Sequence, residues 1–578
     1  PAVGRRRAAP PMAPHRWLVP LLSACAARGA SAKSVHMVIR REFMSPDCVD
    51  RLSVTTNGAL PGPEIRVQPG ELLEVSVENH MEEGAVAIHW HGQNQNGTVW
   101  QDGGAMVSGC PIPPGTSWLY RFNVNGRPGT YQYHAHVGGL RIGGLGGTLI
   151  IEGPVSPHAA HVAGDFALNA MDWWHATDSE LSAMLLMPST RRRWIGGPQS
   201  ILVNGKGSFD CSRTAAMCGT DRSPCPGPEV VDVEAGETYL IRFINGGSLA
   251  HLSAAIEGHS MTIVEVDGMP TAPTPASVID FNSGQRYGVL VTADQPAGVY
   301  TIRFKFRNDM WSDTTGHAFL RYSGATQDVD AVDPTQVELE HPSWDNNTFT
   351  FDFQNSMRGL YGAGGLPPVP GNDRVERRFQ FLATNEHFQD GAPSHLPAGA
   401  STSADDIAAQ IGQGAEKPES FCEGNSTNYD RWAMGRRTFH KPRTPILSKL
   451  YFGIGAEDFT EETSAFRVEM GKVYDIVVQS YPACYQVCET HSWHLHGMHF
   501  WVLGTFRGQW ANTAEQIAAF NLADPVYRDT VMTVGEGEGN VPSEKAGCGY
   551  VVVRFVVDTP GPWLFHCHHM PDVLTGAT

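Results

Sequence analysis

The sequence has few charged residues, little positive charge and no long apolar run. Only 18 % of its 578 residues are charged, and 42 Lys and Arg stand against 60 Asp and Glu, a formal charge of −18. Because binding to a phosphate backbone needs a basic face, this balance excludes a nucleic-acid partner. No apolar stretch reaches the length of a transmembrane helix, so no membrane span is expected.

Helical periodicity is scarce too, and AEQIAAFNLA (514–523) is a short exception. The chain instead has runs of β-branched residues bounded by Gly, Pro, Asn or Asp, as expected for strands. These runs are LLEVSVEN (72–79), GTLIIEG (147–153), TYLIRFING (238–246), YGVLVTAD (287–294), YDIVVQSY (474–481) and YVVVRFVVD (550–558). The pattern predicts an all-β protein built from Greek-key β-sandwiches or barrels.

Composition divides the chain into a leader and three blocks. Residues 1–33 contain a basic residue, a short apolar stretch and Ala30-Ser31-Ala32, which is typical of a secretory signal peptide, against the alternative of a disordered tail. Because the sequence begins with Pro1 and not with Met, residues 1–11 are interpreted as translated leader sequence that is not part of the protein. Blocks are predicted at 34–155, 156–325 and 376–578, with a Gly/Pro-rich linker at 326–375.

Cysteine usage agrees with secretion. The chain has 11 cysteines, which suits an oxidising compartment. Without Cys25 in the leader and Cys567 near the end, the remaining number is odd, so one thiol lacks a partner. Asn96, Asn346 and Asn425 each begin an Asn-x-Ser/Thr sequence and are predicted glycosylation sites.

Four His-x-His pairs are the strongest chemical signal. They are His89 with His91, His134 with His136, His494 with His496, and His566 with His568. On a strand, residues two apart share a face, so each pair is expected to aim two imidazoles at one point. Imidazole suits copper, zinc, iron and nickel, and a neighbouring thiolate narrows the choice towards copper.

Cys567 lies between the two members of the last pair. Its side chain is expected to project from the opposite face of the strand, so a metal on its thiolate would lie across the strand from metals on His566 and His568. A few backbone bonds would join the two sites, which suits electron transfer. His491, three residues before His494, is placed to join the thiolate site.

The motifs HWHG, HAH, HSWHLHG and HCH, in this order, resemble the four copper motifs of the multicopper oxidases over residues 35–572. The resemblance implies three consecutive cupredoxin-like domains and four copper ions. It implies type 2 copper on His89 and His494, and type 1 copper on His491 and Cys567. It implies a binuclear type 3 pair on the remaining six: His91, His134, His136, His496, His566 and His568. Asp102 matches the acid that assists proton delivery to oxygen.

Within the family, the likeness to the ascorbate oxidases is greatest. It includes MDWWH (171–175), RWIGGPQSILVNGKGSFDC (193–211), RWAMG (431–435) and HFWVLG (499–504). Trp194 and Trp432 match the tryptophans that line the reductant pocket, against the alternative that both are core residues. The resemblance also implies disulfides Cys48–Cys225 and Cys211–Cys218, and leaves Cys110 without its usual partner.

The chain departs from the family pattern after its last motif. Asp572 stands where a second type 1 histidine is expected, and Ala577 stands at the axial position. Three explanations are open: the C-terminus is truncated or misread, the site is altered but still binds metal, or oxidase activity has been lost. His569 is the nearest substitute ligand, but two residues along the strand it is expected to be poorly placed.

We therefore predict a secreted multicopper oxidase that couples one-electron oxidation of a small organic reductant, such as ascorbate, to four-electron reduction of dioxygen to water. The alternatives are a laccase-type phenol oxidase, or a copper-binding cell-surface protein with an impaired type 1 site.

Overall fold

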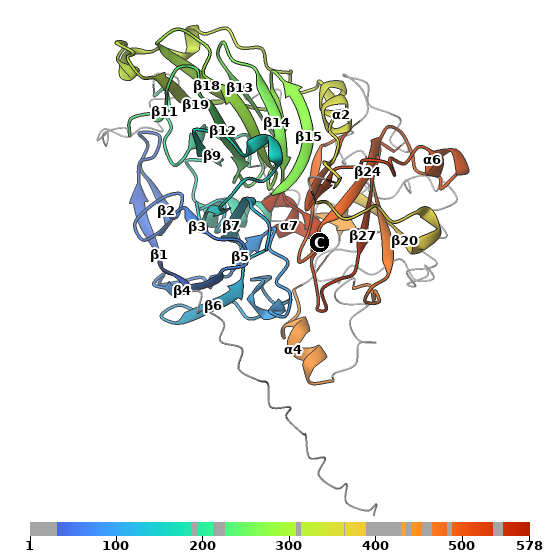
Figure 1. The fold of residues 1–578 in the computed structure, drawn as a ribbon. Coiled ribbons are helices and arrows are strands. Elements are labelled where there is room, and N and C mark those ends of the chain that lie inside the picture. The colour runs from blue at the N-terminus through green and yellow to red at the C-terminus, as the bar shows by residue number, and fades with distance from the viewer. Residues whose placement is uncertain are drawn as a thin grey trace, which may run out of the picture.

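The computed structural model describes residues 32–186, 195–211, 226–307, 314–362, 365–388, 429–434, 439, 441–453, 465–481, 488–535 and 547–577. Strands dominate these residues and form three units of two sheets each, which follow one another from blue to red in Figure 1. The all-β prediction is confirmed.

The first unit contains two four-stranded sheets, with orders β2-β1-β4-β6 and β3-β8-β7-β5. Their strands are β1 (Lys33–Met44), β2 (Arg51–Thr56), β3 (Ile65–Val67), β4 (Leu72–Asn79), β5 (Ile88–His91), β6 (Ser117–Asn123), β7 (Gly129–Ala135) and β8 (Gly146–Ile151). In β4 every second residue is buried, because alternate side chains of a strand face the core between the sheets.

The second unit has sheets of order β10-β9-β12-β17-β14-β15 and β11-β19-β18-β13-β16. Its strands are β9 (Gly164–Trp173), β10 (Ser200–Val203), β11 (Glu229–Val233), β12 (Thr238–Asn245), β13 (Leu252–Ile256), β14 (Met261–Val266), β15 (Met269–Ala276), β16 (Ile279–Phe281), β17 (Arg286–Thr292), β18 (Val299–Phe306) and β19 (Thr315–Tyr322). Aliphatic and aromatic side chains from both sheets form one core between them.

The third unit has sheets of order β21-β20-β22-β27-β24-β25 and β26-β23-β28. Its strands are β20 (Val375–Phe388), β21 (Tyr429–Met434), β22 (Val473–Ser480), β23 (His491–Leu495), β24 (Phe500–Phe506), β25 (Tyr527–Arg528), β26 (Thr530–Thr533), β27 (Gly549–Val556) and β28 (Phe565–Cys567). Strands β22 and β27 are buried almost throughout, as their uninterrupted β-branched runs predict.

The same pairing pattern recurs in all three units. The first strand of each unit pairs in parallel with a later strand: β1 with β4, β9 with β12, and β20 with β22. That later strand then pairs antiparallel with β6, β17 or β27. This repetition agrees with three copies of one cupredoxin-like Greek-key sandwich, while the domain boundaries at 155, 325 and 375 stay predictions.

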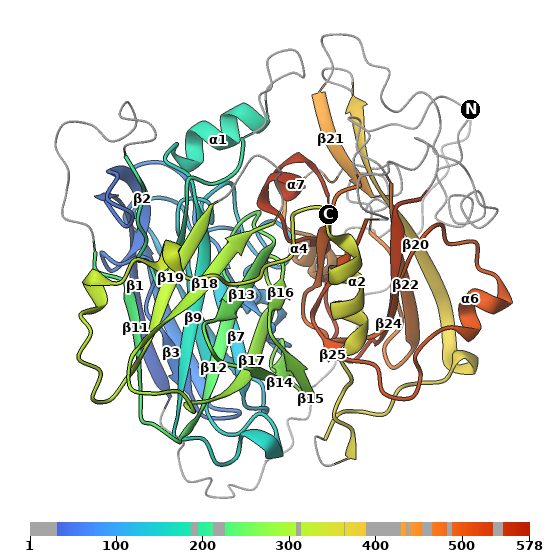
Figure 2. The same cartoon turned by 90° about the horizontal axis from the view of Figure 1, so that it is seen from above.

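Helices are short, and all but the last, which follows the final strand, lie between strands. They are α1 (Asp178–Leu185), α2 (Asn347–Ser356), α4 (Ile446–Tyr451), α6 (Ala514–Ala518) and α7 (Met570–Thr575), with 3-10 turns η1 (Val99–Gln101), η2 (Pro157–Ala159), η3 (Val329–Ala331), η4 (Pro334–Gln336) and η6 (Asn372–Arg374). Helix α7 contacts α1 and β21, and in both views it lies where the units meet (Figures 1 and 2). In the described part of the chain, no helix has the length and apolar character needed to span a bilayer.

Candidate functional site

The eight histidines come together because two strand pairs carry five of them, and the other three, His136, His496 and His568, each follow the last residue of a strand. In the first unit β5 pairs antiparallel with β7, which places His89 opposite His134. In the third unit β23 pairs antiparallel with β28, which places His494 opposite His566. Each of the eight side chains is buried. The two strand pairs thus present their imidazoles to each other across the interface between the first and third units.

The imidazole nitrogens that face one another form three groups. His89 Nε2 and His494 Nε2 lie 3.3 Å apart and form the first group. In the second, His91 Nδ1 lies 3.4 Å from His134 Nε2 and 3.1 Å from His568 Nε2.

In the third group, His566 Nε2 lies 3.2 Å from His136 Nε2 and 3.0 Å from His496 Nε2. Each His-x-His pair therefore divides between two groups, so the expectation that a pair aims at one point was wrong. The reason is that each facing nitrogen approaches nitrogens of other pairs, at 3.0–3.4 Å, and not the nitrogen of its own pair partner.

The opposite ring nitrogens donate hydrogen bonds away from the centre of the pocket. His89 Nδ1 donates to the Asp102 backbone oxygen at 2.8 Å, and His494 Nδ1 donates to that of Asp529 at 2.8 Å. His496 Nδ1 donates to Asp102 Oδ2 at 2.9 Å. Three further rings behave alike: His91 Nε2 donates to Asp529 Oδ1, His134 Nδ1 to Ala135 O and His566 Nδ1 to Cys567 O. His568 differs, because the Arg141 guanidinium donates to its Nδ1 at 2.9 Å.

In six of the eight rings, these outward bonds fix which nitrogen carries the hydrogen, so the facing nitrogens of those rings are bare acceptors. Bare nitrogens cannot bond one another, and a buried set of them needs cations between its members. For ligand bonds of about 2.0–2.1 Å, ligand nitrogens on one ion lie about 3.3–3.6 Å apart, close to the spacings here. The residues therefore fit three metal ions.

Burial keeps these rings neutral. Burial, and then the charges of neighbouring imidazoles, hold the pKa of His136 and His496 well below its usual range. Burial likewise lowers the pKa of His566 to about 3. Because metals bind neutral imidazole, the pocket binds them without first releasing protons.

A buried carboxylate that the sequence did not reveal supports the pocket. Asp529 accepts from His91, and its two oxygens accept from Arg286 Nη1 at 2.8 Å and Nη2 at 2.7 Å. Burial opposes ionisation, but the Arg286 guanidinium holds the pKa of Asp529 below its usual range. Arg286 belongs to β17, so this ion pair joins the second unit to the cluster. No local motif marks Asp529, because its partners lie hundreds of residues away.

Cys567 faces away from the cluster, as its position between two histidines predicts. Its sulfur lies 3.8 Å from His491 Nδ1 and 3.2 Å from Asp572 Oδ2, and all three side chains are buried. His491 Nδ1 also lies 3.1 Å from Asp572 Oδ2. Burial, and then the Asp572 charge, raise the pKa of the Cys567 thiol well above its usual value.

His569 corrects a second expectation. It was expected to be poorly placed to share a metal with the thiolate, but its Nδ1 lies 3.4 Å from Asp572 Oδ2. The strand ends at Cys567, and His569 is the N-cap of α7, so the chain has already turned there. On a strand, side chains two residues apart share a face but stand about 6–7 Å apart. The turn into α7 removes this fixed separation and brings the His569 ring beside the Asp572 carboxylate.

Of the two predicted reductant-binding tryptophans, only Trp432 is described. It is buried in the core of the third unit, and its ring lies edge-on to His491 with centroids 4.4 Å apart. Trp194 lies outside the described residues, and its role and that of Trp432 stay predictions.

The cysteines agree with the predicted framework where it is described. Cys48 and Cys211 are each disulfide-bonded, and their expected partners, Cys225 and Cys218, lie outside the described residues. Cys110 is free and exposed, as expected. Cys488 and Cys548 form a disulfide that the sequence left unassigned.

Comparisons with known proteins agree with this geometry. Family profiles described as multicopper oxidase match residues 39–156, 164–325 and 426–574. The L-ascorbate oxidase of Cucurbita maxima is 31 % identical, over 95 % of this chain and 89 % of its own. Laccase-2 of Oryza sativa subsp. japonica is 29 % identical, over 95 % of this chain and 91 % of its own. The crystal structure of Fet3p, a multicopper oxidase that functions in iron import, superposes with a TM-score of 0.70 at 22 % identity, covering 95 % of this chain and 89 % of that one.

Matches along almost the whole chain, together with a pocket whose bare imidazoles fit three metal ions, place this protein in the multicopper oxidase family, and it is a copper-containing oxidoreductase that uses dioxygen.

Proposed function

We propose that the protein is a secreted oxidase that couples oxidation of a small ene-diol, such as ascorbate, to reduction of dioxygen to water. Two ascorbate molecules each lose two electrons and two protons, and one dioxygen takes up the four electrons and four protons to give two waters. The observation that carries the proposal is the eight-imidazole pocket with a buried thiol on the reverse of the same strand. The ascorbate oxidases among the relatives support the choice of reductant.

Copper in these sites would supply one-electron redox steps and bind dioxygen. The six imidazoles of the two triplets would hold the type 3 pair, and His89 with His494 would hold the type 2 ion. Cys567 and His491 would hold the type 1 ion. Because Cys567 lies between His566 and His568 in sequence, its backbone joins the thiolate to both triplets.

Asp102 is placed to handle protons. One of its oxygens accepts from His496, and the other lies 3.2 Å from His89 Nδ1. Reduction of dioxygen consumes protons, and a buried carboxylate between two of the groups can relay them. A cavity of about 280 Å³, bordered by cluster histidines, Arg141, Lys441 and apolar side chains, reaches the cluster and would admit dioxygen.

Oxygen uptake tests this function. Purified, copper-loaded protein should consume one dioxygen for every two ascorbate molecules, without releasing hydrogen peroxide. Parallel assays with a catechol and with Fe(II) rank the reductants. No uptake with any of the three would exclude oxidase function and favour the alternative of a copper-binding cell-surface protein. Faster uptake with the catechol would favour the laccase-type alternative, which the rice relative supports.

A glycine of the second unit gives a further prediction. Gly284 has φ +89°, and a Cβ there would meet His568 Nδ1 at 2.8 Å. Gly284→Ala should displace the His568 ring and weaken copper binding at its triplet by about 10–100-fold. Metal analysis after dialysis against a chelator measures this. Gly236→Ala is the control, because φ there is +86° but nothing lies within 4 Å of its Cβ. Equal copper loss in both variants would contradict the contact.

A further inference from the structure

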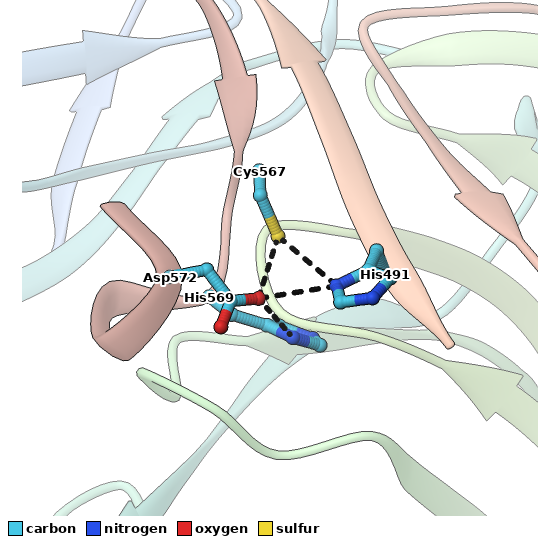
Figure 3. Close-up of side chains that lie close together, drawn as sticks. All are labelled: His491, Cys567, His569 and Asp572. Carbon is cyan, nitrogen blue, oxygen red and sulfur yellow. Dashed lines mark hydrogen bonds and ion pairs between the residues drawn. The ribbon is translucent and has the colours of Figure 1, made fainter. Parts of the chain in front are cut away.

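Four buried side chains converge on the thiolate side of β28, and only two of them, His491 and Cys567, match the family's type 1 ligands. His491, Cys567, His569 and Asp572 each offer a ligand atom, and the four atoms lie within 4.8 Å of one another. Figure 3 shows one Asp572 oxygen between the sulfur and the two imidazoles. That oxygen lies 3.1 Å from His491 Nδ1, 3.2 Å from the sulfur and 3.4 Å from His569 Nδ1.

A buried amide fixes the tautomer of His569. The backbone N–H of Ser283 donates to Asn282 Oδ1 at 2.8 Å, which orients the amide so that its oxygen faces His569. His569 Nε2 therefore donates to Asn282 Oδ1, at 2.7 Å. The hydrogen of the neutral ring is then on Nε2, so Nδ1 is bare and points at the carboxylate.

A bare nitrogen facing a carboxylate oxygen at 3.4 Å is a contact between two acceptors. In a buried site such a contact is costly unless a cation lies between the two atoms. For a four-coordinate ion with bonds of about 2.0–2.3 Å, ligand atoms stand about 3.3–3.6 Å apart. The measured separations of 3.1 to 3.8 Å suit such an ion.

We propose that one copper ion at this site is held by His491 Nδ1, Cys567 Sγ, His569 Nδ1 and Asp572 Oδ2, and that the carboxylate limits the enzyme to strong reductants of the ene-diol class. The second part rests on the proposed oxidase function; the ligand set does not.

The carboxylate sets the reductant class through charge. A hard, anionic oxygen stabilises Cu(II) relative to Cu(I), and in a buried site its charge acts with little screening. The reduction potential of the ion falls, so phenols, which give up an electron less readily than ene-diols, become poor substrates.

Three variants and a spectrum test the ligand set. Asp572→Asn keeps the shape of the side chain but removes its charge, Asp572→His supplies an imidazole, and His569→Gln removes the second ring. His259→Gln is the matched control, because His259 is also buried but bonds Glu257 O and Tyr322 in the second unit. The thiolate-to-copper absorption band and the copper EPR signal are recorded for each protein.

We expect both Asp572 variants and His569→Gln to shift the band and the EPR signal, while the control leaves both unchanged. In Asp572→Asn, the ratio of catechol to ascorbate turnover should rise at least about tenfold. Spectra insensitive to His569→Gln, or to Asp572→Asn, would overturn the four-ligand set. Shifted spectra with an unchanged turnover ratio would overturn the reductant limit.

Failure of the oxidase function remains distinguishable from failure of this inference. If the spectra depend on these side chains but the wild-type protein consumes no oxygen, the four-ligand set stands and the proposed oxidase function is wrong. If the wild-type protein oxidises ascorbate but the spectrum does not change on substitution of His569 or Asp572, the oxidase function stands and the four-ligand set is wrong.

Discussion

Cys567→Ser should lower oxygen uptake with ascorbate by more than a hundredfold and abolish the thiolate-to-copper absorption band. Loss of an outer partner of a metal ligand already costs about 10–100-fold, and this change removes the sulfur ligand itself. The cluster should survive, because the Cys567 side chain points away from His566 and His568 and lies beside His491 and Asp572. The variant should therefore retain three of the four copper ions.

The control for this variant is Cys110→Ser, which changes an exposed free thiol. It should leave uptake, absorption and copper content unchanged. Copper content of one or none in Cys567→Ser, with folding intact by circular dichroism, would show that the two sites do not bind independently. Undiminished ascorbate oxidation would show that electrons do not enter at the thiolate.

Asp102→Asn should slow reoxidation by dioxygen by about 10–100-fold while reduction by ascorbate stays near its wild-type rate. The carboxylate accepts from His496 and lies against His89, so its loss removes a proton carrier and weakens the orientation of two rings. Reduction by ascorbate should be spared, because the histidines that contact the Asp102 carboxylate, His89 and His496, belong to the cluster and not to the thiolate site. Stopped-flow reduction without oxygen, followed by mixing with oxygenated buffer, separates the two half-reactions.

Asp330→Asn is the control, since Asp330 is an exposed carboxylate in η3 and touches neither site. A matching loss in both half-reactions of Asp102→Asn would indicate general damage to the fold. An unchanged reoxidation rate would exclude a proton role for Asp102.

Local pattern was sufficient to predict the strands and the histidine pairs. The run 72–79 coincides with β4, and the runs at 474–481 and 550–558 lie within one residue of β22 and two of β27 at each end. These strands carry β-branched residues at buried positions, so periodicity and burial agree. The opposed faces of Cys567 and its histidine neighbours also followed from strand geometry alone.

The features that the sequence did not predict depend on contacts between residues that lie far apart in the chain. Asp529 and Arg286 meet across two units, and neither stands in a motif. His569 was expected to be poorly placed because the spacing of a strand was extended beyond Cys567, where β28 ends and the chain turns into α7. The division of each histidine pair between two groups also depends on ring positions set by the opposite strand pair.

The central claim is that eight imidazoles from the first and third units hold three copper ions. Anomalous diffraction at the copper absorption edge, from crystals of the copper-loaded protein, tests it most directly. The account predicts three anomalous peaks in the pocket: one between His89 and His494, and one within each triplet of rings. Peaks absent from this pocket, or the eight rings found apart with copper bound elsewhere, would contradict it.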